Sequence, residues 1–425
     1  MDRLVSPAFA PEALAHIFSI KPLLGHSTSV SHILTDSRSL IQPEATLFFA
    51  IRTESGDGHQ YIEALYSAGV RSFVVERITG QESTRYPGAN WYVVPSSVTA
   101  LQRLARAHRE RFSRLEVLGI TGSNGKTIVK ELLYQLLATR YTTVRSPRSY
   151  NSQIGVPLSV LSITEEDELG LFEAGISRTG EMAALEPVIQ PKYGVFTSLG
   201  SAHQEGFSSL EEKLEEKLLL FRHSETLFYS LDDALVREAM QRQFSDRKHI
   251  TWSRRDPKAT LYISECVTRL EQSELSITYA GKSYQLTVPF ADQAYLEDVY
   301  CCLAVVSSLA PELLLEPSAW RSLTSVSMRL EVKDGLQGNT LIDDAYSCDL
   351  QSLSIALDFL RRRSSATSSR PVLLLSDIEG SGRRDADLYA EVAELIRGYG
   401  IAEIFAVGPH LSASQEFFEG MNIHF

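Results

Sequence analysis

Apolar segments alternate with amphipathic segments along most of the chain. Short apolar runs at 47–50, 72–75 and 226–230 have the length of buried strands. In 127–137, leucine and isoleucine recur at helical spacing instead. Strand and helix patterns then alternate through the rest of the chain, which predicts an α/β fold with helices covering a mostly parallel sheet.

Changes in this rhythm divide the chain into three blocks, and 425 residues favour several domains. We expect domains over 1–112, 113–325 and 326–425. Within the second, period-2 segments at 259–289 predict an antiparallel extension of the sheet. We also expect a hinge around Pro311 and Pro317, and a flexible loop at the Ser/Arg stretch 361–370.

Composition narrows the class of protein. A formal net charge of −12 argues against a nucleic-acid surface. No apolar run is long enough to span a bilayer, and the N-terminus lacks a signal-peptide layout. The cysteines show no metal-ligand spacing, so we expect a cytoplasmic protein with reduced thiols at Cys266, Cys301, Cys302 and Cys348.

A glycine-rich polar loop lies between a predicted strand and a predicted helix. Residues 122–127 read Gly-Ser-Asn-Gly-Lys-Thr, after the apolar run 115–121. Such a loop turns backbone N–H groups toward an anion, and the helix behind it adds its dipole. Lys126 would reach the outer phosphates of a nucleotide, and the Thr127 hydroxyl would bind Mg²⁺. The strict spacing requires glycine where this chain has Ile120, so the loop differs from the commonest ATPase form.

Three groups suited to metal and charge handling follow in the same block. Glu173 ends an apolar strand, and His203 follows the next strand. Lys217 lies on a helix that starts with the capping pair Ser209 and Glu212. Taken singly, each is more often a structural or solvated group. Together they predict one site at the carboxyl edge of the sheet.

A series of short motifs extends this pattern over the whole chain. They are TDSR (35–38), LFFA (47–50), DGH (57–59), GITGSNGKT (119–127), NSQIGVP (151–157), EAGISRTGEM (173–182), SAHQEGFSSLEEKLEEK (201–217), MRLE (328–331) and DDAYSCD (343–349). In order and spacing, the chain resembles the Mur ligases, the ATP-dependent amide-forming family of peptidoglycan precursor synthesis. The resemblance implies a central P-loop ATPase domain, an N-terminal UDP-substrate domain and a C-terminal Rossmann-like domain.

The resemblance also implies residue roles. Lys126 and the loop amides would hold the β- and γ-phosphates. Thr127 and Glu173 would hold one Mg²⁺, and His203 a second. Lys217 falls where the family carries a lysine carbamylated by CO₂, which converts a cation into an oxygen ligand. Asn151 would face the reacting groups. The other implied ATP contacts are Gly122, Ser123, Asn124, Gly125, Asp298, Arg329 and Asp344, and the implied UDP-sugar contacts are Asp36, Ser37, Arg38 and His59.

The implied reaction joins D-alanyl-D-alanine to UDP-N-acetylmuramoyl-tripeptide through an acyl phosphate, with ATP and Mg²⁺. Closure of the third domain over ATP would exclude water. A sister ligase that adds a diamino acid to the UDP-dipeptide is an alternative, although its Asp-Asn-Pro-Arg motif is absent. A folate polyglutamylation ligase and a non-catalytic nucleotide-binding regulator are further alternatives. The uridine-type first domain disfavours the former, and the retained Lys126, Glu173, His203 and Lys217 disfavour the latter.

Some positions depart from the family pattern. On the adenine side the family usually carries His-Asn and a further Asn, whereas 294–298 here reads Ala-Tyr-Leu-Glu-Asp. Only Asp298 is a plausible substitute. Similar divergence occurs in ligases fused to a C-terminal alanine racemase. Because Phe425 comes soon after the predicted strand 404–407, we expect an incomplete third domain and a racemase domain in a longer protein.

Overall fold

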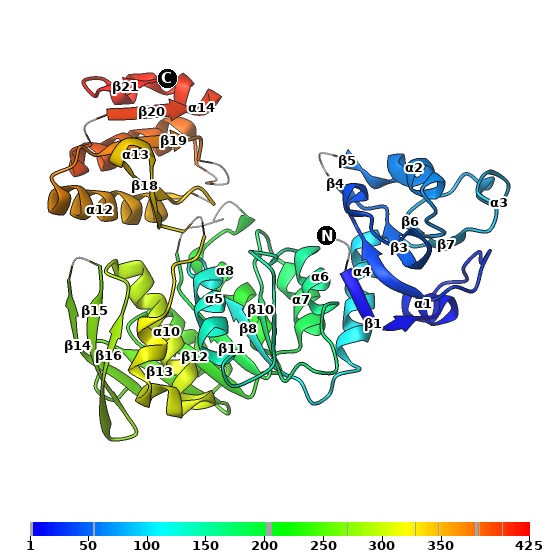
Figure 1. Cartoon of the computed structure of the whole chain (residues 1–425), viewed down its shortest axis with the longest axis horizontal. Coiled ribbons are helices and arrows are strands. Elements are labelled where there is room, and N and C mark those ends of the chain that lie inside the picture. The colour runs from blue at the N-terminus through cyan, green and yellow to red at the C-terminus, as the bar shows by residue number, and fades with distance from the viewer. Residues whose placement is uncertain are drawn as a thin grey trace.

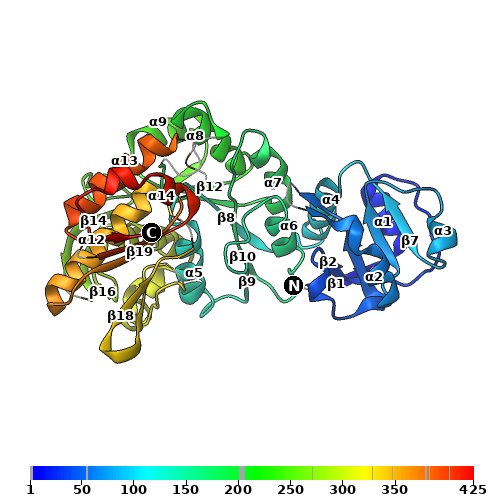
Figure 2. The same cartoon turned by 90° about the horizontal axis from the view of Figure 1, so that it is seen from above.

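The computed structural model describes residues 3–53, 56–200, 206–269, 271–327, 329–346, 348–378, 381, 383–401 and 403–425. Three α/β bodies follow one another along the chain, each built on its own sheet (Figure 1). Figures 1 and 2 both place the first body at one end of the molecule, away from the third. The exact domain boundaries that we expected, after residues 112 and 325, stay a prediction.

The first body is a five-stranded sheet in the order β1-β2-β3-β6-β7. Strand β1 is antiparallel to β2, and the other neighbours are parallel. Apolar side chains cover both faces, as expected for a parallel sheet. Its elements are β1 Arg3–Phe9, α1 Pro11–Phe18, β2 Val30–Leu34, β3 Thr46–Phe49, the hairpin β4 Arg52–Thr53 and β5 Gly56–Asp57, α2 Ile62–Ser67, β6 Ser72–Val75, α3 Glu82–Arg85, β7 Asn90–Val93 and α4 Ser97–Arg109.

The central body is a nine-stranded sheet in the order β16-β15-β14-β13-β12-β11-β8-β10-β9. Strands β8 to β14 run parallel, and β15 and β16 add the predicted antiparallel extension. The strands are β8 Glu116–Thr121, β9 Thr143–Arg145, β10 Leu169–Glu173, β11 Tyr193–Phe196, β12 Thr226–Ser230, β13 Lys248–Ser253, β14 Leu261–Thr268, β15 Ser273–Tyr279 and β16 Lys282–Val288.

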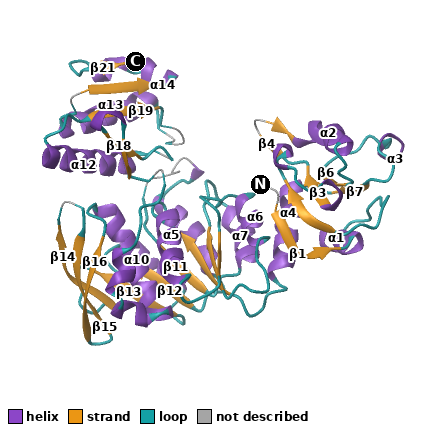
Figure 3. Ribbon diagram, in the orientation of Figure 1, coloured by secondary structure: helices purple, strands orange, loops and turns teal. Residues whose placement is uncertain are grey.

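Helices cover both faces of this central sheet. Figure 3 shows α5 and α10 side by side, and both pack in the same hydrophobic cluster. Helices α6, α7 and α8 belong to the cluster on the other face, which α4 of the first body also joins. The helices are α5 Lys126–Leu137, α6 Gly155–Val160, α7 Glu181–Ile189, α8 Leu210–Leu218, α9 Ala234–Gln243 and α10 Gln293–Leu309.

The third body has a small parallel sheet in the order β19-β20-β21. The predicted strand at 404–407 is confirmed. The elements are the hairpin β17 Glu331–Asp334 and β18 Thr340–Asp343, then α12 Leu350–Thr367, β19 Val372–Ser376, α13 Asp385–Tyr399, β20 Glu403–Val407, α14 Pro409–Ala413 and β21 Ile423–His424.

Two predictions about flexible segments were wrong. The expected hinge around Pro311 and Pro317 is a pair of short helical segments whose Leu313 and Trp320 are buried in the central core. The expected loop at 361–370 is largely helical, because α12 continues to Thr367. A sequence rich in serine tolerates this, since each hydroxyl can bond back to the preceding turn, as that of Ser364 does with the Leu360 carbonyl at 2.6 Å.

The four cysteines are free thiols, as expected. Among the described residues, no helix has the length and apolar character to cross a bilayer.

Candidate active site

The predicted phosphate loop connects β8 to α5. Gly122 and Gly125 have positive φ angles of 148° and 82°, which glycine adopts far more readily than other residues. At Gly125 space is limiting as well, because a Cβ there would lie 2.1 Å from an Asp298 carboxylate oxygen. Asp298 therefore lies directly against the loop. Burial, together with the nearby Asp292 and Glu297 carboxylates, raises the pKa of Asp298 well above its usual range.

The segment after β11 holds the loop in place. The Ser123 N–H donates to the Ser198 carbonyl at 2.7 Å. The Thr197 hydroxyl donates to the Asn124 carbonyl at 2.5 Å. The loop conformation thus depends on a neighbouring strand of the sheet as well as on its own glycines.

Two lysines converge on the loop carbonyls. Lys126 Nζ donates to the carbonyls of Gly122 at 3.0 Å and Ser123 at 2.8 Å. Lys217 Nζ, from α8, donates to the same Gly122 carbonyl at 2.9 Å. Burial lowers the pKa of Lys126 to about 8. Burial, followed by the positive charges of Lys126 and Lys213, lowers the pKa of Lys217 well below its usual range.

Glu173 is a buried carboxylate beneath this loop. It ends β10, is fully buried, and neither carboxylate oxygen has a hydrogen-bond partner among the described residues. Nζ of Lys130, on α5, lies 3.8 Å from Oε2 of Glu173. Burial raises the pKa of Glu173, and the charges of Lys130 and Lys126 oppose that shift. A buried carboxylate that lacks donors is suited to hold a cation.

The Mg²⁺ ligand set that we expected is only partly visible. The Thr127 hydroxyl lies 2.8 Å from the Ser149 hydroxyl, and His203 lies outside the described residues. In the part of the chain that the structure describes, no three His, Cys, Asp or Glu side chains come together as metal ligands. Glu173 and Thr127 carry oxygen donors of the kind that Mg²⁺ prefers, so the residues present fit that ion.

Residues of the third block face the loop across a cavity of about 2330 Å³. Asn151, Arg329 and Asp344 line it together with residues of the phosphate loop. Asp344 accepts from the N–H of Leu330, the residue after Arg329, at 3.2 Å. Burial raises the pKa of Asp344 to about 6. The Arg329 guanidinium lies 4.3 Å from the centre of the Tyr346 ring.

The predicted UDP-sugar residues lie apart from this cavity, in the first body. Asp36 follows β2 and forms an exposed ion pair with Arg38 at 2.7 Å. The hydrogen bonds from Arg38 lower the pKa of Asp36 to about 2. Ser37 begins the short helical turn Ser37–Ser39, which Asp36 caps. This turn lies at the carboxyl edge of a parallel sheet, where such sheets bind ligands.

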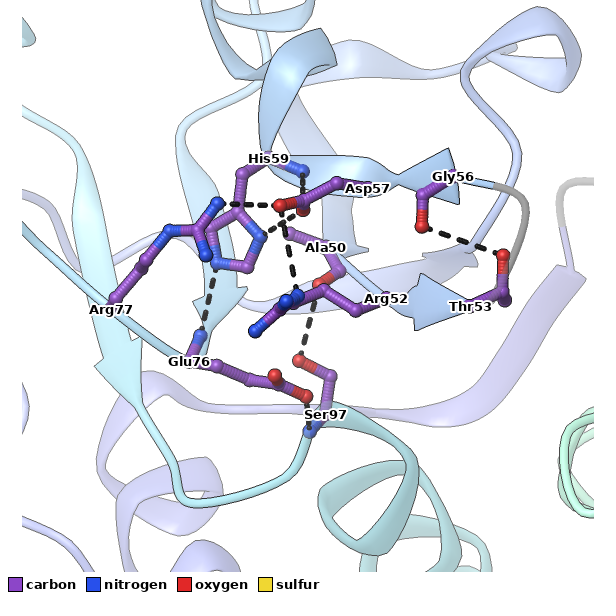
Figure 4. Close-up of polar contacts among 9 residues, drawn as sticks. All are labelled: Ala50, Arg52, Thr53, Gly56, Asp57, His59, Glu76, Arg77 and Ser97. Carbon is purple, nitrogen blue, oxygen red and sulfur yellow. Dashed lines mark hydrogen bonds and ion pairs between the residues drawn. The ribbon is translucent and has the colours of Figure 1, made fainter.

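His59 belongs to a second polar cluster in the first body, shown in Figure 4. Its Nδ1 lies 2.6 Å from an Asp57 carboxylate oxygen, and its Nε2 accepts from the Glu76 N–H at 3.1 Å. Asp57 also pairs with Arg52 and Arg77. Both ring nitrogens of His59 thus have partners within the first body, and its role toward the UDP-sugar stays a prediction.

The structure brings most of the predicted ATP residues together and adds some that the sequence reasoning missed. Lys130 and Lys213 are fully buried near the site. Each lies one helical turn from a lysine that was identified, Lys130 after Lys126 and Lys213 before Lys217. The i, i+4 spacing places each pair on one helix face and is the signal that could have found them.

A phosphate loop in a parallel sheet, with a second α/β body across the cavity, defines a P-loop nucleotide-binding protein of several domains. The profile of the Mur ligase middle domain matches residues 120–306. This similarity to the Mur ligase family covers the central body of the chain.

Individual relatives match over most of the chain. The UDP-N-acetylmuramoyl-tripeptide–D-alanyl-D-alanine ligase of Bacillus subtilis is 28% identical over 388 residues, covering 90% of this chain and 80% of the relative. The crystal structure of MurF from Acinetobacter baumannii aligns with a TM-score of 0.83 at 21% identity, covering 98% of this chain and 89% of that one. MurF from Thermotoga maritima in complex with ADP aligns with a TM-score of 0.75 at 22% identity, covering 92% and 87%.

Proposed function

We propose that this chain is an ATP-dependent ligase that joins D-alanyl-D-alanine to UDP-N-acetylmuramoyl-tripeptide, with release of ADP and phosphate. One observation carries the proposal. A phosphate loop with Lys126, Glu173 and Lys217 around it faces Arg329 and Asp344 of the third block across one cavity. The similarity to relatives with this activity extends over 90% of the chain.

The phosphate loop would bind the β- and γ-phosphates of ATP through its N–H groups and the start of α5. Lys126 now donates to two loop carbonyls and would turn to the phosphates when they bind. The terminal carboxylate of the UDP-tripeptide attacks the γ-phosphorus, and the bond to ADP breaks. The positive charge of Lys126 favours this step, because negative charge spreads over the transferred group.

The amine of D-alanyl-D-alanine then attacks the acyl-phosphate carbonyl carbon, phosphate leaves, and the nitrogen loses a proton. Asn151 lines the cavity beside the loop, so we assign it to orienting the reacting groups. Glu173 and Thr127 would hold Mg²⁺, which supplies charge neutralisation at the phosphates when bound. Arg329 would bind the phosphates of ATP and Asp344 its ribose. Asp298 would lie on the adenine side.

Lys217 is proposed to carry a carbamate. Its amine is buried beside two other lysines, and this environment favours the neutral form. The neutral amine is the nucleophile that adds to CO₂, with loss of one proton, to give an anionic oxygen ligand. His203 is proposed to support a second Mg²⁺.

The first body is proposed to bind the UDP-sugar through Asp36, Ser37 and Arg38. His59 is proposed to act behind this surface by fixing Asp57, which in turn orients Arg52 and Arg77 (Figure 4).

Phosphate release from Mg-ATP tests the proposal. We expect release only when UDP-N-acetylmuramoyl-tripeptide and D-alanyl-D-alanine are both present. The matched control pair is the UDP-dipeptide precursor with meso-diaminopimelate. Activity with the control pair alone would reassign the chain to the sister ligase. Binding of ATP without phosphate release in either mixture would contradict the ligase proposal for this chain.

A further inference from the structure

Lys213 is a fully buried cation that the proposed reaction does not yet use. It lies on α8, one helical turn before Lys217, and its side chain has no exposed surface. A buried ammonium group is costly unless it has hydrogen-bond partners, so its position needs a specific contact. Lys213 Nζ donates to the Gly200 carbonyl at 2.6 Å.

Gly200 in turn contacts the phosphate loop through both of its backbone polar groups. The Ser123 hydroxyl donates to the Gly200 carbonyl at 3.0 Å and accepts from the Gly200 N–H at 2.9 Å. We call this two-bond contact the Ser123–Gly200 pair. The Gly200 carbonyl therefore accepts from the loop and from Lys213 at once.

The contacts continue to the phosphate-binding lysine. The Ser123 carbonyl accepts from Lys126 Nζ at 2.8 Å. A chain of hydrogen bonds thus runs from Lys213 through Gly200 and Ser123 to Lys126. It links α8, which also carries Lys217, to the loop that would hold the nucleotide phosphates.

We infer that Lys213 is a positioning residue for nucleotide binding, which fixes the phosphate loop through the Ser123–Gly200 pair. The inference rests on the nucleotide-binding part of the proposed function. It does not depend on the identity of the peptide substrates.

The electrostatics agree with this geometry. Burial, followed by the charge of Lys126, lowers the pKa of Lys213 to about 8. Lys213 in turn contributes to the lowered pKa of Lys217. The three ammonium groups therefore share one electrostatic environment, which a bound polyphosphate would stabilise.

Calorimetric titration with Mg-ADP tests the inference on the intact chain. We expect K213M to weaken ADP binding at least tenfold, because the loop loses the contact to α8 that runs through the Ser123–Gly200 pair. Adenosine affinity and the KM for the UDP-tripeptide should change less than twofold, since neither depends on the loop. K192M is the matched control. Lys192 pairs with Glu116 at the amino ends of β11 and β8, away from the phosphate loop at their carboxyl ends. Its loss should leave ADP affinity unchanged.

A double-mutant cycle separates positioning from general destabilisation. S123A removes the hydroxyl of the Ser123–Gly200 pair and should weaken ADP binding in the same direction. Because both residues act through Gly200, K213M/S123A should be little worse than the poorer single variant. If K213M does not fold, as a melting curve would show, K213Q replaces it in the same cycle.

Additive losses, or wild-type ADP affinity in the Lys213 variant, would overturn the inference. An equal loss of ADP, adenosine and UDP-tripeptide binding would also overturn it, since that pattern indicates a purely structural role. The ADP and adenosine titrations stay informative if the wild-type chain binds ADP but fails the ligase assay. In that case the proposed reaction would fail while the inference about Lys213 could still hold.

Discussion

At the scale of single residues, this site depends on burying charges that water would otherwise stabilise. Lys213 and Lys217 are lysines with almost no exposed surface, and Glu173 is a carboxylate with none. The free energy of each charged form depends on its few close partners, so each pKa moves away from its usual value. Substitutions here should therefore affect chemistry more than those at exposed charges.

Replacing Lys217 should abolish ligase activity. We expect K217A to lose at least about 100-fold in kcat, roughly 2.7 kcal/mol of transition-state stabilisation. Added bicarbonate should not restore it, because no amine remains to react with CO₂. Phosphate release with both substrates is the measurement, and K248A, at an exposed lysine of the same body, is the control. Wild-type activity in K217A would contradict the role of Lys217.

His108 should make the folded protein sensitive to mild acid. Its Nε2 lies 2.9 Å from the Ile163 carbonyl, and its Nδ1 has no hydrogen-bond partner among the described residues. Burial lowers its pKa from 6.5 to about 4. The unfolded chain therefore binds a proton between these values that the folded chain does not, so stability falls as the pH drops through this window.

We expect His108 to contribute a loss of roughly 2–3 kcal/mol in the free energy of unfolding between pH 7.5 and 4.5. Urea unfolding of the wild type and of H108L at several pH values measures it. The free energy of unfolding should change less steeply with pH in H108L, because leucine cannot take up the proton. Equal slopes in the two proteins would show that His108 is not responsible.

At the scale of elements, α8 connects separate parts of the central body through its side chains. One face carries Lys213 and Lys217 toward the phosphate loop. Glu216 instead accepts from the N–H groups of Gly180 and Met182, at 2.9 and 3.0 Å, where α7 begins. This carboxylate satisfies free N–H groups at a helix start, where a negative charge is also favourable.

Removing Glu216 should weaken the α7–α8 contact. We expect E216A to lower the free energy of unfolding by about 1–2 kcal/mol, the usual cost of losing a helix cap. E216Q should lose less, because its amide oxygen can still accept. E215A is the control on the same helix, since Glu215 pairs with Arg242 at the surface. Urea denaturation distinguishes these variants, and equal stability of E216A and E215A would contradict the capping role.

At the scale of the whole molecule, the first and central bodies share one hydrophobic cluster. Helix α4 packs against α6 and α7, although it follows the strands of the first body in sequence. Arg109, near the end of α4, is buried and donates to the carbonyls of Phe112, Leu115 and Ile189. These contacts fix the connection between the two bodies, so we expect them to unfold together.

Arg109→Met should therefore destabilise both bodies. It removes the guanidinium donor from three carbonyls, of which that of Phe112 keeps a backbone N–H donor at 3.2 Å. The cost is roughly 2–4 kcal/mol. Tryptophan fluorescence can follow the change, since Trp91 is buried in the first body and Trp252 in the central one. In proteins that keep only Trp91 or only Trp252, the substitution should shift the urea midpoint of unfolding by the same amount. R106M, at an exposed residue of α4, should shift it little. Separate midpoints in the parent protein would contradict joint unfolding.

Much of this organisation was readable from the sequence. The apolar runs gave the strands, because a buried parallel strand needs little beyond a short apolar segment between turn residues. The loop at 122–127 located the nucleotide site, since few other arrangements need glycines before a lysine at a helix start. The predictions of a hinge near Pro317 and of a loop at 361–370 were wrong. Local composition could not reveal the buried Trp320 or the continuation of α12.

By itself, then, the sequence determined the α/β class, the order of elements and the phosphate loop, all of which depend on residues close together in the chain. Only the tertiary structure decided which charges are buried and which groups they contact. Lys213 and Gly200 are separated by thirteen residues and Lys217 and Gly122 by ninety-five, yet each pair forms a hydrogen bond. The physical reason is that burial and partnership depend on how distant segments pack, and these set the energy of a charge in a protein interior.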